Sequence, residues 1–236
     1  MALFQKSGPV PAVHTLRALA HLLRYPDAEL RAHLGELADA LQLEAAVSGH
    51  RLDELQALIR RLQTLDAFQN ESEYVELFDR GRSTALHLFE HVHGDSRDRG
   101  PAMIDLIQTY EQAGLYLGPE ELPDHLPVLL EFASTQPPQQ AREFLAETAH
   151  IVRRIFSALL KRESPYASVL AAVLELAGEK AEAVPVPAEP PMDESWAEPE
   201  VFGGCSTEGQ NRPGQPQPVR IVRNASSTAS SLGVQP

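Results

Sequence analysis

Cysteine, tryptophan and positive charge are all scarce in this chain of 236 residues. Cys205 is the single cysteine, so the chain cannot form an internal disulfide, a cysteine-rich zinc site or an iron–sulfur ligand set. The formal net charge is −13. That charge argues against nucleic-acid binding, which needs a cationic face to neutralise phosphates. It argues equally against electrostatic docking on an anionic membrane surface.

Long apolar runs are also missing. No segment approaches the ~18–20 apolar residues that are needed to cross a bilayer, and residues 1–13 contain no signal-peptide core. The lack of disulfides fits a reducing compartment. We therefore expect a cytoplasmic protein that does not insert into membranes. Phosphate-binding glycine loops and the nucleophile elbow of hydrolases are absent as well, which excludes the ordinary nucleotide-binding folds.

Apolar residues recur at helical spacing along most of the chain. The clearest case is residues 139–162, where Phe144, Val152 and Leu159 belong to one continuous apolar stripe. No window alternates with period two for long enough to predict a strand. The sequence therefore predicts an all-α protein, with helices over residues 14–23, 26–47, 52–68, 70–78, 84–92, 100–113, 127–132, 139–162 and 166–177.

Composition divides the chain into three parts. Residues 1–13 form a short flexible N-terminus that is closed by two prolines, and residues 14–180 form a single helical domain. Residues 181–236 are rich in proline, glycine and serine, and such a segment cannot bury enough apolar surface to offset its ordering entropy. We expect this C-terminal tail to be disordered. Residues 196–205 hold the tryptophan and the cysteine and form either a short contact motif or a chance cluster.

A dense polar segment lies in the middle of the chain, over residues 78–103. Residues His87–His91 within it match H-x-x-E-H, the inverted zinc-protease motif. Histidines four residues apart on a helix share a face and can bind one zinc ion, with the glutamate as general base. The third ligand lacks support, because the next helix offers only Asp105 and Glu111. We therefore expect neither a metal site nor a catalytic residue, and keep zinc hydrolysis as a weak alternative.

Two further polar clusters have both a structural and a functional interpretation. Residues Asp95–Arg99 alternate in charge, which is typical of a solvated loop with weak ion pairs. The same arginines can instead offer forked donors to the carboxylates or carbonyls of a partner. Asp124 can simply cap the helix that follows it. The sequence alone leaves these alternatives open.

Three stretches of the chain resemble a known family. They are LLRYPD at Leu22–Asp27, YVELFDRGRSTALHLFEHVHGDSRDRGPAMIDL at Tyr74–Leu106 and ELPDHLPVLLEF at Glu121–Phe132. They strongly resemble the NarJ family, the assembly chaperones of membrane-bound respiratory nitrate reductase. The wider relatives of that family are the TorD/DmsD-like redox-enzyme maturation proteins. The resemblance covers residues 14–180, and residues 196–205 resemble the family's C-terminal segment more weakly.

The resemblance implies a single TorD-like helical domain that is not an enzyme. Such a chaperone would bind the N-terminal, leader-like segment of the apo α subunit of nitrate reductase and hold the αβ complex in the cytoplasm. It would hold no cofactor stably, but would assist insertion of bis-molybdopterin guanine dinucleotide into its client before membrane docking. The cofactor biosynthesis proteins are further candidate partners. Two alternatives stay open: another molybdoenzyme as client, and a helical adaptor that binds through its tail.

Residues 121–125 resemble in part the E-P-x-D-H motif that the family resemblance links to leader binding. Leu122 replaces the first proline of that motif and the proline follows at Pro123, which puts in doubt the guanine nucleotide binding of some relatives. Histidines with ordinary pKa values would make leader affinity depend on pH between about 6 and 7. The candidate leader contacts are Tyr25, Glu90, His91, His93, Asp95, Arg97, Asp98, Arg99, Glu121, Asp124 and His125.

Overall fold

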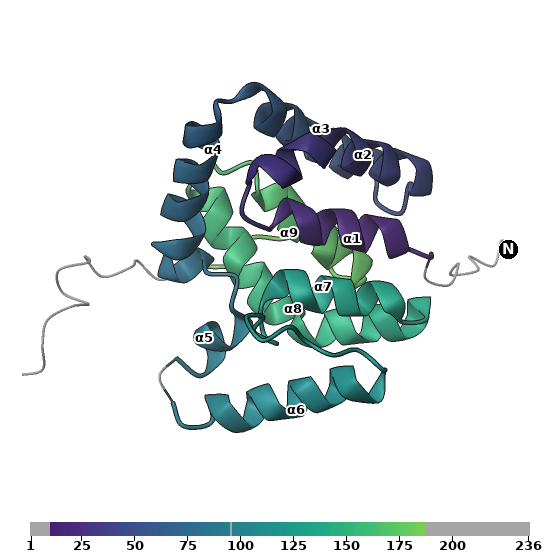
Figure 1. The fold of residues 1–236 in the computed structure, drawn as a ribbon, viewed down its shortest axis with the longest axis vertical. Coiled ribbons are helices and arrows are strands. Elements are labelled where there is room, and N and C mark those ends of the chain that lie inside the picture. The colour runs from purple at the N-terminus through teal and green to yellow at the C-terminus, as the bar shows by residue number, and fades with distance from the viewer. Residues whose placement is uncertain (1–9, 95, 187–236) are drawn as a thin grey trace, which may run out of the picture. The chain divides into compact units, whose positions relative to one another are not determined.

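The computed structural model describes residues 10–94 and 96–186. All the regular elements of these residues are helices (Figure 1), which confirms the all-α prediction. None of the described helices is both long and apolar enough to cross a membrane. The elements are α1 (Val13–Leu22), α2 (Ala28–Glu44), α3 (Gly49–Thr64), α4 (Ala67–Tyr74), the π-helical turn η1 (Val75–Asp79), the 3-10 turn η2 (Arg82–Thr84), α5 (Leu88–Val92), α6 (Arg99–Gln112), α7 (Leu126–Thr135), α8 (Pro138–Lys161) and α9 (Ala167–Leu176).

Helix α1 lies at the centre of the helical domain, packed between α2 and α7 and against α9 (Figure 1). Its apolar side chains, among them Leu16, Leu19 and Leu22, are buried in the main core. Helix α2 in turn packs on α3, so these two helices cover one side of α1. Helices α2 and α7 therefore flank α1 on two sides.

Helices α8 and α9 form the other side of the core. The stripe expected on α8 is buried at Val152, Ile155 and Leu159, and α8 packs on both α7 and α9. Helix α9 is mostly apolar and buries eight of its ten residues, as an interior helix should. The helices predicted over residues 139–162 and 166–177 are confirmed to within one residue at each end. Leu160, the apolar residue next to Leu159 in α8, is exposed instead.

The helix predicted from residue 70 begins three residues earlier, at Ala67. Asp66 caps it, since its carboxylate accepts a hydrogen bond from the Phe68 N–H over 2.8 Å. Asn70 is instead buried inside the helix, where its side-chain amide donates to the Leu62 carbonyl over 2.9 Å. Asp66 and Asn70 are both good capping residues, and because Asn70 bonds to the end of α3, Asp66 takes the capping position.

The helix predicted over residues 84–92 is wrong in its first half. Residues 82–84 form the 3-10 turn η2, the chain then extends, and α5 begins only at Leu88. The Thr84 hydroxyl donates to the carbonyls of Leu77 and Gly81, and so ties this turn to the preceding π-helical one. His87 therefore precedes α5 instead of lying within it.

Helix α6 meets the rest of the domain through Leu106 and Tyr110. Tyr110 is buried and packs on Phe132 of α7 with 4.8 Å between ring centroids, in a small second core. Gly94 and Gly114 have φ values of 51° and 80° on the two sides of α6. Glycine adopts this left-handed conformation without steric cost, so both helix ends predicted at these glycines are confirmed.

The packed chain continues past the last helix. Ala181 packs against the main core, and the Val184 N–H donates to the Ser157 hydroxyl over 2.9 Å. Residues 1–9 and 187–236, including the 196–205 cluster, lie outside the described residues, so the division at residues 13 and 180 stays a prediction.

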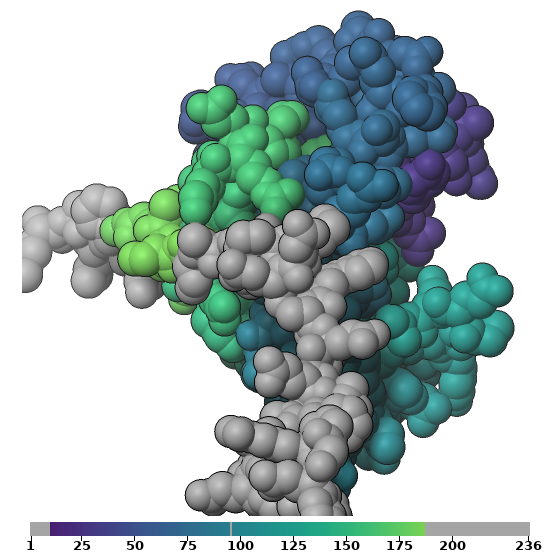
Figure 2. All heavy atoms as spheres, turned by 90° about the vertical axis from the view of Figure 1, so that its left-hand side faces the viewer, coloured from purple at the N-terminus to yellow at the C-terminus, as the bar shows by residue number. Residues whose placement is uncertain are grey.

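Figure 2 shows another face, where α3 and α4 (blue) adjoin the end of α8 (green).

Candidate peptide-binding site

Two loops that are far apart in the sequence pair with each other beside the start of α7. His87 and His125 form an isolated antiparallel bridge between them. The bridge joins the polar middle segment to the motif that ends at residue 125, and we call residues 85–90 and 121–126 the loop junction. Two backbone hydrogen bonds flank the bridge: Leu126 N–H to the Leu86 carbonyl (2.9 Å) and Leu88 N–H to the Asp124 carbonyl (3.0 Å).

Asp124 is the buried charge of the loop junction, with an exposed fraction of 0%. Its Oδ2 accepts a hydrogen bond from the Phe89 N–H over 3.1 Å, so Asp124 caps α5 rather than the helix that follows it. His87 Nδ1 lies 3.5 Å from Oδ1, and Arg99 Nη2 lies 3.7 Å from Oδ2. Burial alone would raise the pKa of Asp124, but these three neighbours outweigh burial and hold the pKa below its usual range.

The two histidines of the junction stack on each other, with 4.8 Å between ring centroids and 24° between ring planes. Contact with the Asp124 carboxylate raises the pKa of His87 against the opposing effect of burial. Burial, and next the charge of His87, lower the pKa of His125 to about 4. The two pKa values move in opposite directions, so a proton on the stacked pair favours His87 over His125.

An open groove runs beside the junction between α1, α7 and residues 115–121. It has a volume of about 390 Å³. Tyr110, Val128 and Phe132 supply its apolar side, and Glu121 and Glu131 supply two carboxylates. We call it the α1–α7 groove, and it is lined by Arg17, His21, Tyr110, Leu115, Tyr116, Leu117, Glu121, Val128, Glu131, Phe132, Ser134 and Thr135.

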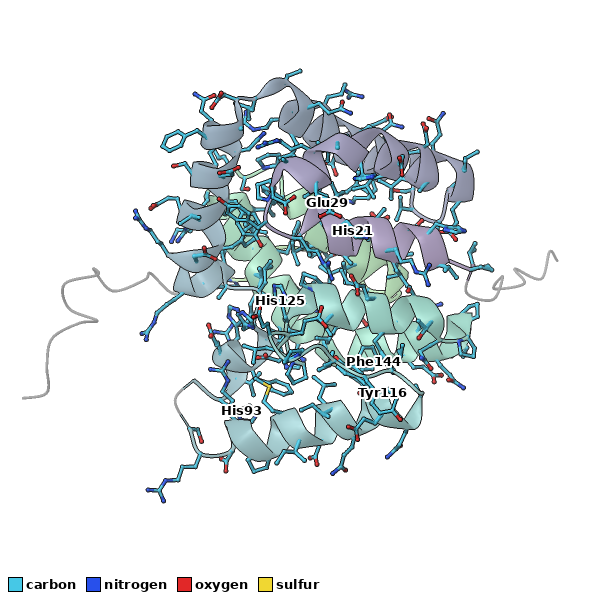
Figure 3. The ribbon with its side chains drawn as sticks, viewed as in Figure 1. His21, Glu29, His93, Tyr116, His125 and Phe144 are labelled. Carbon is cyan, nitrogen blue, oxygen red and sulfur yellow. The ribbon has the colours of Figure 1, made fainter. Side chains whose placement is uncertain are left out.

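A second opening adjoins the first on the far side of His21, which lines both. This α1–α2 hollow has a volume of about 370 Å³ and lies between the end of α1 and the start of α2. Figure 3 shows His21 and Glu29, which both line it, close together on these two helices. Its lining residues are His21, Arg24, Tyr25, Asp27, Glu29, Leu30, His33, Glu36 and Leu37.

Comparison with known proteins identifies the family. Residues 23–172 match the family model described as nitrate reductase delta subunit. The chain belongs to the nitrate reductase delta subunit family. It is 45% identical over 159 residues to the nitrate reductase molybdenum cofactor assembly chaperone NarJ of Escherichia coli K12, which is 67% of each chain. NarW from the same bacterium is 42% identical over 163 residues, 69% of this chain and 68% of the relative.

A solved structure of a redox enzyme maturation protein from Archaeoglobus fulgidus shows the same fold. It aligns with a TM-score of 0.50 over 75% of this chain and 99% of its own, at 21% sequence identity. The NarJ-family resemblance and the TorD-like helical fold predicted from the three matching stretches are thus confirmed. The NarJ relatives are named as chaperones rather than catalysts, in agreement with the expectation that this protein is not an enzyme.

The structure brings only some of the predicted site residues together. Glu90, Arg99, Asp124 and His125 meet at the loop junction, where Arg99 Nη2 lies 3.5 Å from Glu90 Oε1. Glu121 lies beside them and turns toward the α1–α7 groove. Arg99 therefore forms ion pairs within the protein. For this residue the geometry agrees with the structural interpretation of residues Asp95–Arg99.

Other predicted residues lie apart from the junction. Tyr25 stands at the edge of the α1–α2 hollow, where its hydroxyl donates to Glu71 over 3.1 Å. His93 packs edge-on against Phe89, and Arg97 and Asp98 are exposed beyond it. Asp95 lies outside the described residues. Leu19 and Leu23, the apolar residues that precede Tyr25, are fully buried in the core and line neither opening.

The zinc alternative loses its geometric basis. His87 precedes α5 and faces Asp124, so it does not share a helix face with His91. The His91 Nε2 atom hydrogen bonds to the Ala85 carbonyl over 2.8 Å, and burial lowers the pKa of this histidine. In the part of the chain that the structure describes, no three histidine, cysteine, aspartate or glutamate side chains gather as a metal site.

The pH dependence expected from ordinary histidines is wrong for His91 and His125. Burial lowers the pKa of both, so each titrates below the ordinary histidine value, and His125 titrates near 4. Of the two junction histidines, His87 has the raised pKa and therefore takes up a proton first as pH falls.

The sequence did not mark four of the groove residues as candidates, namely Arg17, His21, Tyr116 and Glu131. Glu131 carried a usable signal, because it is the one charge in the apolar run LPVLLEF. The other three carried none. They come from α1 and from the loop after α6, and only the packing of α1 on α7 brings them together.

Proposed function

We propose that this protein is an assembly chaperone for respiratory nitrate reductase. Membership of the delta subunit family, and the 45% identity to a chaperone named for molybdenum cofactor assembly, support this function. The protein would act in the cytoplasm on the apo αβ complex while bis-molybdopterin guanine dinucleotide is inserted into the α subunit. The cofactor is cargo for the client and is not held stably by the chaperone.

We place the N-terminal, leader-like segment of the α subunit in the α1–α7 groove. One observation carries this assignment: the groove combines an apolar floor with two carboxylates, Glu121 and Glu131, at its rim. An amphipathic segment with basic residues needs this combination, since apolar burial supplies affinity and opposite charge supplies selectivity and encounter rate. The groove is also of the size usual for ligand sites.

The loop junction serves this groove indirectly. The Tyr110 hydroxyl donates to the Pro123 carbonyl over 2.8 Å, and Asp124 next to it is fixed by its three partners. These contacts hold the backbone of residues 121–125 and hence the position of Glu121. We assign Glu121 to direct contact with the client, and Glu90, Arg99 and Asp124 to positioning.

Calorimetric titration of an N-terminal peptide of the α subunit into the full-length protein tests the proposal. We expect a dissociation constant between about 1 nM and 1 μM, which corresponds to roughly −12 to −8 kcal/mol. No binding heat at high micromolar concentration would overturn the proposed function.

A matched pair of variants tests the location. Tyr116 in the groove and Phe68 on α4 are both aromatic and have similar exposed fractions, 79% and 77%. Tyr116→Ala is expected to weaken peptide binding by about fivefold or more, because aromatic contacts dominate such interfaces. Phe68→Ala is expected to leave binding within about twofold, as for a residue outside the interface. Equal effects of the two variants would contradict the placement.

A further inference from the structure

Arg24 stands between the two openings along α1. It lines the α1–α2 hollow, while its side chain reaches the two carboxylates of the α1–α7 groove. Arg24 Nη2 lies 2.7 Å from Glu131 Oε1 and 3.8 Å from Glu121 Oε1. The side chains of Arg24 and Glu131 remain 40% and 39% exposed, so water and ligands can reach the pair.

We propose that Arg24 occupies the carboxylates to which an arginine of the client binds, and that the client displaces it. The inference rests on the proposed function, and it names the contact that selects the client. An incoming guanidinium would take Glu131 and Glu121 from Arg24, and Arg24 would turn into the α1–α2 hollow toward Glu29 and Glu36. The hollow has the acidic groups and the room to receive it.

The exchange costs little free energy because one ion pair replaces another, and Arg24 holds both carboxylates through a single nitrogen, Nη2. Arginine offers two parallel N–H donors to a carboxylate, which a lysine ammonium cannot do. A client arginine would therefore displace Arg24 more readily than a client lysine would. A segment without an arginine would leave both carboxylates paired with Arg24 and would gain no ion pair from them. Arg24 therefore lowers the affinity for other basic or apolar segments relative to the client.

This account predicts an effect of opposite sign to that of an ordinary contact residue. If Arg24 competes with the client, then its removal frees Glu131 and Glu121 and tightens binding. If Arg24 merely braces the groove or contacts the client directly, then its removal weakens binding. The sign of the change separates the two roles.

The test is calorimetric titration of the α-subunit N-terminal peptide into full-length Arg24→Gln. We expect binding about threefold to tenfold tighter than in the wild type. Arg60→Gln, at an exposed position on α3, makes the same charge change away from the groove and is expected to alter binding by less than about twofold. Weaker or unchanged binding in Arg24→Gln would overturn the inference.

Two further variants complete the test. Glu131→Gln removes the contested carboxylate and is expected to weaken binding by about threefold to tenfold. The double variant Arg24→Gln/Glu131→Gln is expected to lose most of the gain of Arg24→Gln, because the two residues act on the same contact. An undiminished gain in the double variant would contradict the exchange.

The experiments distinguish a folding defect of the variant, a failure of the proposed function and a failure of the Arg24 exchange. Urea unfolding shows whether Arg24→Gln folds, and if it does not, Arg24→Lys keeps the charge without the fork and is expected to tighten binding by a smaller factor. If the wild-type protein fails to bind the peptide at all, the proposed function falls. If the wild type binds and only the sign for Arg24 is reversed, the inference alone falls.

Discussion

A single buried carboxylate connects three segments of this protein. Asp124 caps α5, faces His87 and lies near Arg99 at the start of α6. The sequence pattern marked Asp124 as a capping residue but pointed to the wrong helix. The capped helix lies 35 residues earlier in the chain, and a contact of that separation leaves no local signal.

Replacement of Asp124 tests its role in stability. Asp124→Asn keeps the shape of the side chain but leaves His87 and Arg99 without their buried counter-charge. We expect a loss of about 2–3 kcal/mol in the free energy of unfolding at pH 7, less than for a fully buried pair because both partners are partly exposed. Urea unfolding measures this loss, and Asp98→Asn on the exposed neighbouring loop is the control, with less than about 0.5 kcal/mol expected.

The stacked histidines predict how stability depends on pH. The folded-state pKa of His125 is lowered to about 4, so its contribution to stability is present above the unfolded pKa of about 6.5 and is lost as pH falls toward 4. His87 has the opposite sign: its raised pKa stabilises below the unfolded value, and this contribution is lost as pH rises through the folded value.

His125→Phe keeps an aromatic ring at this position but cannot be protonated. We expect the wild type to lose about 2 kcal/mol of stability between pH 6.5 and 4.5 from this residue, and the variant to lose correspondingly less. Urea unfolding at several pH values measures both curves. Parallel curves for the two proteins would show that His125 does not carry this dependence.

Among the elements, the least regular part of the domain is the turn between α4 and α5. There the π-helical turn η1 runs into the 3-10 turn η2, and Gly81 lies between them. A Cβ atom at Gly81 would lie 2.5 Å from the Leu77 carbonyl oxygen and 2.9 Å from Arg162 Nη1. The close approach of the backbone therefore requires glycine at this position.

A pair of glycine variants tests that requirement. Gly81→Ala is expected to destabilise the protein by about 1–3 kcal/mol, because its neighbours must move to make room. Gly35→Ala, in the middle of α2 with nothing within 4 Å of the added carbon, is expected to stabilise by up to about 1 kcal/mol. Thermal unfolding compares the two. A neutral Gly81→Ala variant would contradict the packing seen at this turn.

Helices with a continuous apolar stripe could be predicted from the sequence, and the five-residue helix α5 could not. Helix α8 and the helix ends at Gly94 and Gly114 follow local rules of periodicity and left-handed glycine. The start of α5 does not, since a backbone hydrogen bond from Leu88 to Asp124 sets it. The predicted helix over residues 84–92 failed for that reason, and with it the shared helix face that zinc binding needed.

At the scale of the whole molecule, the α1–α7 groove depends on the topology. Its walls come from α1, from the loop after α6 and from α7, which only the central position of α1 brings together. The junction residues were predicted because they are dense in charge. The groove residues are far apart in the sequence and form no motif. Of the residues that line the groove, only Glu121, next to the junction, was therefore among the predicted contacts.

Removal of residues 187–236 distinguishes the groove from a tail-mediated adaptor. The main core lies within the described residues and includes contacts as far as Ala181. We expect the truncated protein to bind the α-subunit peptide within about twofold of the full-length protein. A deletion that removes no contact of the groove should leave the groove's affinity nearly unchanged. An adaptor that binds through its tail would instead lose the interaction in the same titration.

The most direct test of the account is to map where the peptide binds. Amide spectra of the full-length protein, recorded during titration with the α-subunit N-terminal peptide, report the change at each residue. The account predicts the largest shifts at His21, Tyr116 and Glu131, with little change at Phe68 and Arg60. Saturable binding whose largest shifts lie on α3 and α4, with the α1–α7 groove unchanged, would contradict it.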